Sequence, residues 1–213
     1  MGKKQNVRVM AMDMQAVQRE CFDIAKKIHG EGYIPDLVVF IAKSGFMFAE
    51  PIAKYFNCDM AAVTVKRPGN DHKDMIRRYI KYIPQWLLFS VLRSKFTYNY
   101  NDMHEEREVS VNTRFLEMSK QAKYQNILLV DDSTDTGLSL IKAKEVLEKH
   151  FPDSEIRTFC YCVISLSEKR VKADYLKYRD TIVVTATSRY SKEHNAFLNA
   201  YNEWNRLQAE AAS

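Results

Sequence analysis

The sequence predicts an α/β fold with a mostly parallel central sheet of four or five strands between helices. Helical and strand-like patterns alternate along the chain, which is the order that parallel pairing needs. Residues 37–42 and 127–130 are continuous apolar runs, typical of strands buried on both faces. Each run leads into a short polar loop and then a helical pattern, so both are expected to begin strand-loop-helix units.

The first predicted helix begins after Asp13, whose side chain can cap it, and ends at Gly30. Its apolar residues follow three-four spacing, and they are Met14, Val17, Cys21, Ile24 and Ile28. A turn at Pro35-Asp36 leads into a strand-loop-helix unit and the strand after it. Their expected ranges are 37–42 for the strand, 43–45 for the loop, 46–56 for the helix and 60–65 for the next strand.

The segment from Lys66 to Arg107 departs from this alternation, and we place an insertion at about 68–106. It contains a basic helical pattern, the helix-breaking Pro84, a short aromatic helix and a polar loop. Three interpretations stay open: a lid or part of a dimer interface, a membrane-surface segment, and a binding site for nucleic acid or another protein.

The remaining elements return to alternation. Val109 and Val111 predict an edge strand. Further strands are expected at 126–131, 156–164 and 181–186, and helices at 138–150 and from 191 to the end. Neither repeats nor a long linker interrupt the chain, so residues 1–213 are expected to form one domain.

The composition is that of a globular protein, with 46% hydrophobic residues. No apolar stretch approaches the roughly 20 residues that span a bilayer, and no secretory signal is recognised, which predicts a cytoplasmic protein. The cysteines lack CxxC spacing and are expected to be small buried residues. The net charge of +5 suits an anionic substrate, while the dispersed basic residues argue against a nucleic-acid partner.

The most informative motif is the run from Ile127 to Gly137. A buried strand ends in the carboxylates Asp131 and Asp132, and a loop of Ser, Thr, Asp and Gly follows before a helix. Ligands of open α/β sheets bind at the carboxyl ends of strands. Carboxylates can hold sugar hydroxyls or a metal, and a helix N-terminus suits a phosphate. The motif therefore predicts a site for a phosphorylated sugar.

This run resembles the phosphoribosyl-pyrophosphate (PRPP) signature of type I phosphoribosyltransferases. The resemblance implies their fold, with a small hood built from the N-terminal region and about 165–190. It implies Asp131 and Asp132 on the ribose hydroxyls and at an Mg²⁺ site. The residues implied on the 5′-phosphate are Ser133, Thr134, Asp135, Thr136 and Gly137. A receiver domain also has a strand ending in acids, but there the pair lies near the amino terminus.

Residues Lys43, Ser44 and Gly45 follow the earlier strand and offer backbone N–H groups and one cation to an anion. The loop resembles the pyrophosphate-binding loop of the family, in the hypoxanthine-guanine variant. That resemblance implies pyrophosphate binding here, with a strained or cis peptide at Ala42-Lys43.

Asp135 bears on the acceptor. In the enzymes that act on 6-oxopurines an Asp precedes Thr-Gly, as Asp135 precedes Thr136 here. The resemblance implies that Asp135 partners the acceptor nitrogen as a catalytic group. The alternative is that Asp135 caps the following helix.

Two further family elements match loosely. Thr97 and Tyr98 resemble the Ser-Tyr pair of the flexible loop that closes over the reaction. In the hood, Lys169 is the nearest candidate for the lysine on the purine 6-oxygen, and Ile182 and Val183 stand where an aromatic often stacks. Tyr190 is a replacement stacker.

The resemblance therefore implies an Mg²⁺-dependent transferase that moves ribose phosphate from PRPP to a nucleobase, a 6-oxopurine, in purine salvage. The expected assembly is a homodimer or a tetramer, without a membrane span. Two alternatives remain: the same fold acting on an unusual acceptor, and a regulator that senses PRPP or a nucleotide.

Overall fold

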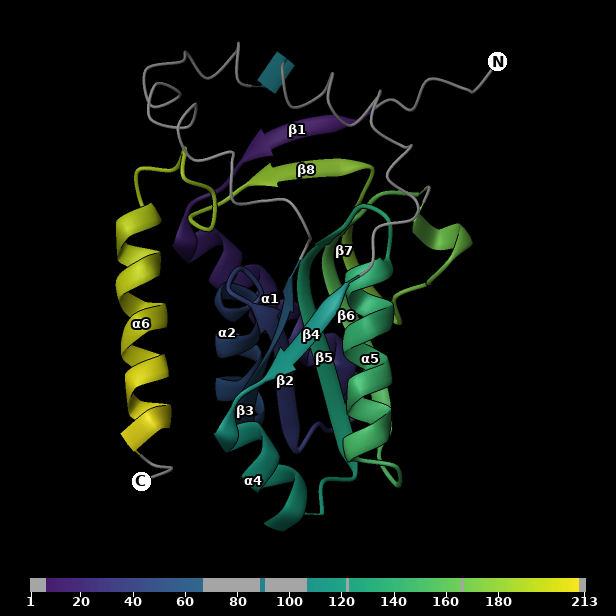
Figure 1. Cartoon of the computed structure of the whole chain (residues 1–213). Helices are drawn as coiled ribbons and strands as arrows, with labels where there is room; N and C mark the ends of the chain where they lie inside the picture. The colour runs from purple at the N-terminus through teal and green to yellow at the C-terminus, as the bar shows by residue number, and fades with distance from the viewer. Residues whose placement is uncertain (1–6, 67–88, 91–106, 122, 166, 211–213) are drawn as a thin grey trace.

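The computed structural model describes residues 7–66, 89–90, 107–121, 123–165 and 167–210 (Figure 1). The insertion expected at about 68–106 lies outside the described residues, apart from Phe89 and Ser90. None of the described helices is long and apolar enough to cross a membrane.

The central sheet has six strands in the order β4-β3-β2-β5-β6-β7. They are β2 (Leu37–Ala42), β3 (Asp59–Lys66), β4 (Glu108–Val111), β5 (Asn126–Thr134), β6 (Glu155–Val163) and β7 (Tyr175–Arg179). All neighbours pair in parallel except β4, which is antiparallel to β3 at the edge. The α/β class with a mostly parallel sheet is confirmed. The expected four or five strands are too few, because β7 was not recognised in the sequence.

Five α-helices are described in addition to a short 3-10 helix, Ser167–Lys169. They are α1 (Met14–Gly30), α2 (Phe46–Phe56), α4 (Thr113–Gln121), α5 (Leu138–His150) and α6 (His194–Glu210). Asp13 caps α1 as predicted, with its carboxylate accepting from Ala16 N at 2.7 Å.

Alternation along β2 divides the core between the two faces of the sheet. Val38 and Phe40 pack in a cluster with residues of α1, α2 and α6, whereas Leu37 and Val39 pack with residues of α4 and α5. All four side chains are fully buried. The continuous apolar run therefore gives a strand covered on both faces, as parallel sheets require.

A second, two-stranded sheet forms from β1 (Arg8–Ala11) and β8 (Thr181–Val184), which pair in parallel. In Figure 1 this pair lies across the end of the main sheet where β2 and β5 terminate. The chain passes from β7 to β8 through Asp180, whose φ is +49°. The Asp180 carboxylate accepts hydrogen bonds from the backbone N–H and the hydroxyl of Ser165, which fixes this corner.

Candidate active site

Strand β5 extends through the acids, so successive side chains alternate between opposite faces. Asp131 is buried, and its Oδ1 accepts from Asp132 N at 2.9 Å. Asp132 is half-buried and lines a cavity. Thr134 is buried, and its hydroxyl donates to Ser167 Oγ at 3.1 Å because the Ser167 hydroxyl donates to Ile164 O. The two acids therefore have different environments although they are adjacent.

Burial shifts the pKa values of both acids upward. Burial, and next the Asp132 carboxylate, raise the pKa of Asp131 well above its usual value. Burial also raises the pKa of Asp132, while hydrogen bonds from Asp131 and from the Ser44 hydroxyl act to lower it. Asp132 is consequently the member of the pair that more readily carries the negative charge into the cavity.

The loop after β5 turns at Gly137, the N-cap of α5, with φ +79°. This left-handed conformation is strained for residues that carry a Cβ. Asp135 is not at the N-cap position and instead lines the cavity. The start of α5 lies beside Ser133 and Asp135, which places backbone N–H groups of a helix N-terminus next to the acids.

The loop between β2 and α2 approaches from the neighbouring strand. The Ala42-Lys43 peptide is cis, as the sequence analysis expected. Gly45 packs tightly: a Cβ there would lie 2.7 Å from Ile41 O and 3.0 Å from Val130 O. Lys43 is exposed, and its Nζ lies 5.8 Å from the ring centroid of Tyr201.

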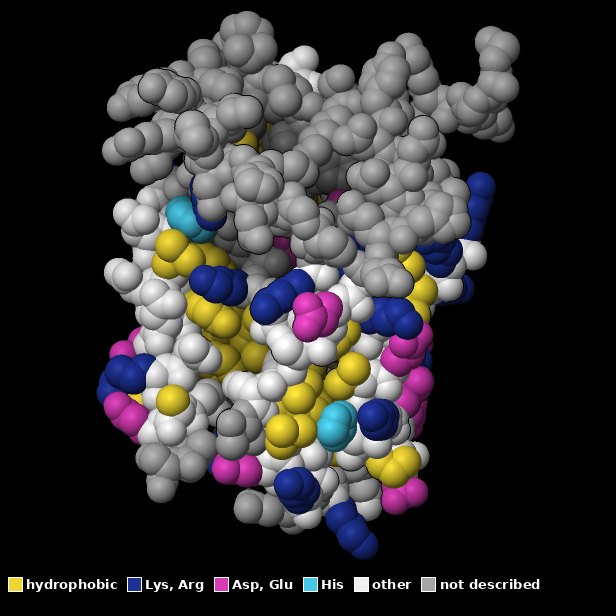
Figure 2. Space-filling model, in the orientation of Figure 1, with side chains coloured by type: hydrophobic (Ala, Val, Ile, Leu, Met, Phe, Trp, Pro, Cys, Tyr) yellow, Lys and Arg dark blue, Asp and Glu magenta, His cyan; other side chains and the backbone are white. Residues whose placement is uncertain are grey.

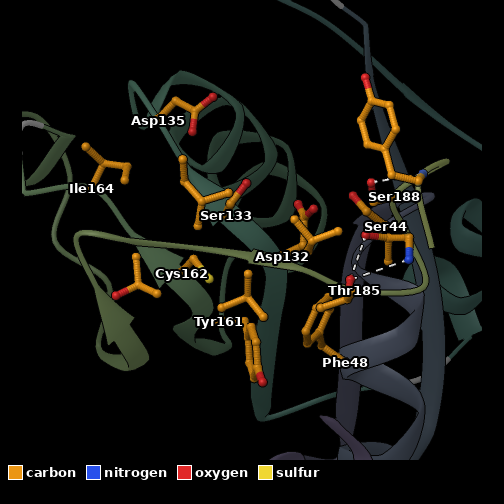
Figure 3. A pocket seen from close by; sticks show the side chains of 16 residues that line it. Ser44, Phe48, Asp132, Ser133, Asp135, Tyr161, Cys162, Ile164, Thr185 and Ser188 are labelled. Carbon is orange, nitrogen blue, oxygen red and sulfur yellow. Dashed lines mark hydrogen bonds between the residues drawn. The ribbon is translucent and has the colours of Figure 1, made fainter. Parts of the chain in front are cut away.

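One cavity of about 360 Å³ lies between these loops and the β1–β8 sheet (Figure 3). This volume is within the range of small-molecule sites. Its lining combines two carboxylates and several hydroxyls with an apolar wall. The residues are Ser44, Phe48, Asp132, Ser133, Asp135, Tyr161, Cys162, Ile164, Thr181, Ile182, Val183, Val184, Thr185, Thr187, Ser188 and Tyr190.

Some of the predicted base-binding residues line the cavity and others do not. Ile182 and Val183, from β8, line the cavity, and Tyr190 lines it with 39% of its surface exposed. Lys169 is exposed at the end of the 3-10 helix and is not among the lining residues. Thr97 and Tyr98 lie outside the described residues.

Several lining residues were not identified from the sequence. Thr185, Thr187 and Ser188 place hydroxyls in the cavity, and the Thr185 and Thr187 hydroxyls are 3.0 Å apart. The signal was available, because a Thr-Ala-Thr-Ser run follows directly after an apolar strand pattern. Phe48 and Tyr161 were expected only as helix and strand residues.

Phe48 and Tyr161 are among the most buried residues of the lining. Their ring centroids are 4.5 Å apart, and both side chains are only 1% exposed. The Tyr161 hydroxyl donates to Glu20 Oε2 at 2.6 Å, while the Tyr178 hydroxyl donates to Oε1 at 2.7 Å. Glu20 thus holds both phenols from α1, so Tyr161 presents a fixed ring to the cavity.

Within the described part of the chain, no group of three or more His, Cys, Asp or Glu side chains is placed to hold a metal ion. All four cysteines are free thiols; Cys58 is partly buried and the other three are buried.

Comparison with known proteins identifies the architecture. The family model described as a phosphoribosyl transferase domain matches residues 12–193. A search among curated proteins found no match.

Solved structures share the fold at low sequence identity. A purine phosphoribosyltransferase from Pyrococcus horikoshii is 16% identical, with a TM-score of 0.55, and the match covers 83% of this chain and 91% of that one. A hypothetical protein from Neisseria gonorrhoeae with bound ppGpp is 16% identical, with a TM-score of 0.54 and coverages of 92% and 98%. The xanthine-guanine-hypoxanthine phosphoribosyltransferase of Helicobacter pylori is 11% identical, with a TM-score of 0.53 and coverages of 84% and 92%.

Proposed function

The chain belongs to the phosphoribosyl transferase domain family, and on this premise we propose that it moves ribose 5-phosphate from PRPP to a 6-oxopurine in an Mg²⁺-dependent reaction. The enzyme class itself, a phosphoribosyltransferase, is confirmed by the family match over residues 12–193. The acceptor, the metal and the residue roles are the proposal.

The observation that carries the proposal is the convergence of three segments on one cavity. Ser44 comes from the β2–α2 loop, Asp132 and Asp135 come from the β5–α5 segment, and Val183 comes from β8. Hydrogen bonding between Ser44 and Asp132 joins the first two segments. A sugar diphosphate held by both loops would present its C1 to the space that remains beneath β8.

In this arrangement the β5–α5 loop binds the 5′-phosphate through residues 133–137 and the N-terminus of α5. Asp131 and Asp132 hold the ribose hydroxyls, with Asp132 carrying the charge that faces C1 as positive charge develops there. Lys43, Ser44 and Gly45 bind the departing pyrophosphate. These contacts fix the reacting atoms in line, which is the main contribution of positioning to such a transfer.

Asp135 supports the choice of acceptor. It lines the cavity beside Ser133, so its carboxylate can accept the proton of a purine ring nitrogen as the new bond forms. Hydroxyls donate as well as accept, so Thr185, Thr187 and Ser188 can pair with both the oxo and the N–H groups of a 6-oxopurine. Ile182 and Val183 supply the apolar face for the ring.

The residues present fit an Mg²⁺ ion that is bound mainly by the phosphate oxygens of the substrate. Mg²⁺ keeps most of its shell as water and phosphate oxygens and needs one or two protein carboxylates. Asp132 lines the cavity and would supply one such carboxylate, while the neighbouring Asp131 is buried and accepts a hydrogen bond from Asp132 N. When bound, the ion would neutralise the pyrophosphate leaving group.

The test is pyrophosphate release from PRPP and Mg²⁺, measured with hypoxanthine, guanine, xanthine, adenine, uracil and orotate in turn. Release with an oxopurine is expected. Release with adenine or orotate alone would overturn the 6-oxopurine assignment. Silence with every base, alongside PRPP binding by calorimetry, would favour a regulator that senses PRPP.

A further inference from the structure

Helix α6 lies outside the segment that the family model matches, which ends at residue 193. It runs beside α2 at the face of the sheet that α1 and α2 cover (Figure 1). Figure 2 shows hydrophobic side chains along the seam between this helix and the sheet. Helix α6 therefore lies next to the β2–α2 loop, where its side chains can restrict the conformation of that loop.

The seam is an aromatic cluster around the end of β2. The ring of Tyr201 lies 6.5 Å from Phe40 and 5.6 Å from Phe46, between ring centroids. Trp204 lies 5.0 Å from Phe40 and 5.7 Å from Phe46. Phe40 and Phe46 flank residues 41–45, so α6 packs against both ends of the β2–α2 loop.

Tyr201 differs from Trp204 in one respect that concerns the loop. The Lys43 ammonium lies 5.8 Å from the Tyr201 ring centroid, within the range of a cation–π contact. We propose that Tyr201 is a positioning residue, which restricts the Lys43 ammonium within the loop assigned to pyrophosphate. This inference rests on the proposed function, because it assigns the anion at Lys43 to pyrophosphate.

A contact that restricts Lys43 should raise the affinity for pyrophosphate, because an exposed lysine side chain has many conformations. Lysine loses more side-chain entropy than most residues when it is fixed. A ring face that attracts the ammonium reduces the number of conformations before the anion arrives, and it leaves the N–H donors available. An exposed cation–π contact is worth about 0.5–1 kcal/mol. Pyrophosphate affinity should therefore fall by about two- to fivefold without the ring.

The experiment measures the affinity of the full chain for inorganic pyrophosphate with Mg²⁺, by calorimetry. Tyr201→Phe keeps the ring and should bind like the wild type, whereas Tyr201→Leu should bind about two- to fivefold more weakly. Trp204→Leu is the matched control, because it removes a ring from the same cluster without touching Lys43. It should lower the melting temperature and leave the affinity unchanged.

A double-mutant cycle separates positioning from packing. If Tyr201 acts through Lys43, then Tyr201→Leu should have no further effect on affinity in a Lys43→Met background. Where Tyr201→Leu does not fold, Tyr201→Met replaces it. Equal weakening by Tyr201→Leu and Trp204→Leu, or an unchanged affinity in Tyr201→Leu, would overturn the inference. Failure of the wild-type chain to bind pyrophosphate would overturn the proposed function and this inference with it.

Discussion

A Cβ atom on Gly137 would lie 2.3 Å from Val171 Cγ1, so these two residues leave no room for a side chain where α5 begins. Gly137 also has a left-handed backbone, with φ +79°. The loop proposed to hold the 5′-phosphate is therefore restricted to glycine at this position for two separable reasons.

Gly137→Ala should lower the free energy of unfolding by about 2–3 kcal/mol, from the left-handed backbone and the contact with Val171 together. Gly32→Ala isolates the first cause, because Gly32 has φ +80° and open space around its Cβ position. It should cost about 1 kcal/mol. Urea unfolding of each variant, and of Gly137→Ala in a Val171→Ala background, checks the division. If both variants lose the same free energy of unfolding, the side chain of Val171 moves away from the new Cβ without a measurable cost.

Replacing both acids of β5 by amides should abolish turnover and leave the fold intact. Asp131→Asn keeps an oxygen that can accept from Asp132 N, which lies 2.9 Å from Asp131 Oδ1. Asp132→Asn removes the charge that lines the cavity. Steady-state rates and circular dichroism of the double variant check this expectation. Rates like those of the wild type would contradict the proposed roles of both acids.

The raised pKa of Asp131 predicts a pH-dependent stability difference. Above about pH 4 the unfolded chain ionises this carboxyl, whereas the folded chain keeps its proton. The folded state then binds more protons, so this group lowers stability as pH rises towards its folded pKa. Asp131→Asn has no carboxyl to titrate here. The free energy of unfolding of the variant, relative to that of the wild type, should therefore rise by up to about 1.4 kcal/mol for each unit of pH increase.

Urea unfolding at pH 5 and pH 7 measures that difference. Asp153→Asn, on an exposed turn, is the control for an Asp-to-Asn exchange outside the site. An Asp131→Asn advantage that shrinks as pH rises would mean that the carboxyl is stabilised in its charged form by the fold.

Asp135→Asn should slow transfer to the acceptor by about 10²- to 10⁴-fold, the usual contribution of a general base. Binding of pyrophosphate should not change, because Asp135 is assigned to the acceptor. Single-turnover rates and calorimetry separate the two effects. A small loss in rate would instead make Asp135 a residue of the phosphate loop alone.

His194→Ala should loosen the segment that carries Thr185, Thr187 and Ser188. His194 Nδ1 lies 2.9 Å from Ala186 O, and since a carbonyl only accepts, Nδ1 carries the hydrogen. Loss of this bond should cost about 1–2 kcal/mol and raise the KM of the acceptor more than that of PRPP. His150→Ala, whose ring packs on Phe115 at the end of α5, is the control for a lost histidine.

The elements with strong local signals were predicted closely. The bounds of β2, α2 and α5 agree with the expected ranges, because a continuous apolar run or three-four spacing ends at a clear polar or glycine boundary. In contrast, β1 and α4 were not predicted. β1 is a strand only through its pairing with β8 at the other end of the chain, and such pairing has no local pattern.

The candidate site divides in the same way. Asp132 and Asp135 could be placed from the motif that contains them, since a strand and its following loop are contiguous. Phe48 and Tyr161 could not, because they belong to a helix and a strand that meet only in the folded sheet. Lys169 was chosen only as the lysine nearest to the expected position, and the residues that line the cavity do not include it.

Asp180 divides the second half of the chain into two stretches with different proposed roles. Residues 126–137, before it, include the strand and loop proposed to hold the sugar and also Asp135, whereas residues 181–190, after it, line the part of the cavity proposed to face the acceptor ring. Under the proposed function, an exchange of residues 181–190 would change this wall and leave the strand and loop proposed to hold the sugar unaltered. The proposed acceptor wall is thus encoded by one continuous stretch of sequence that begins at this turn.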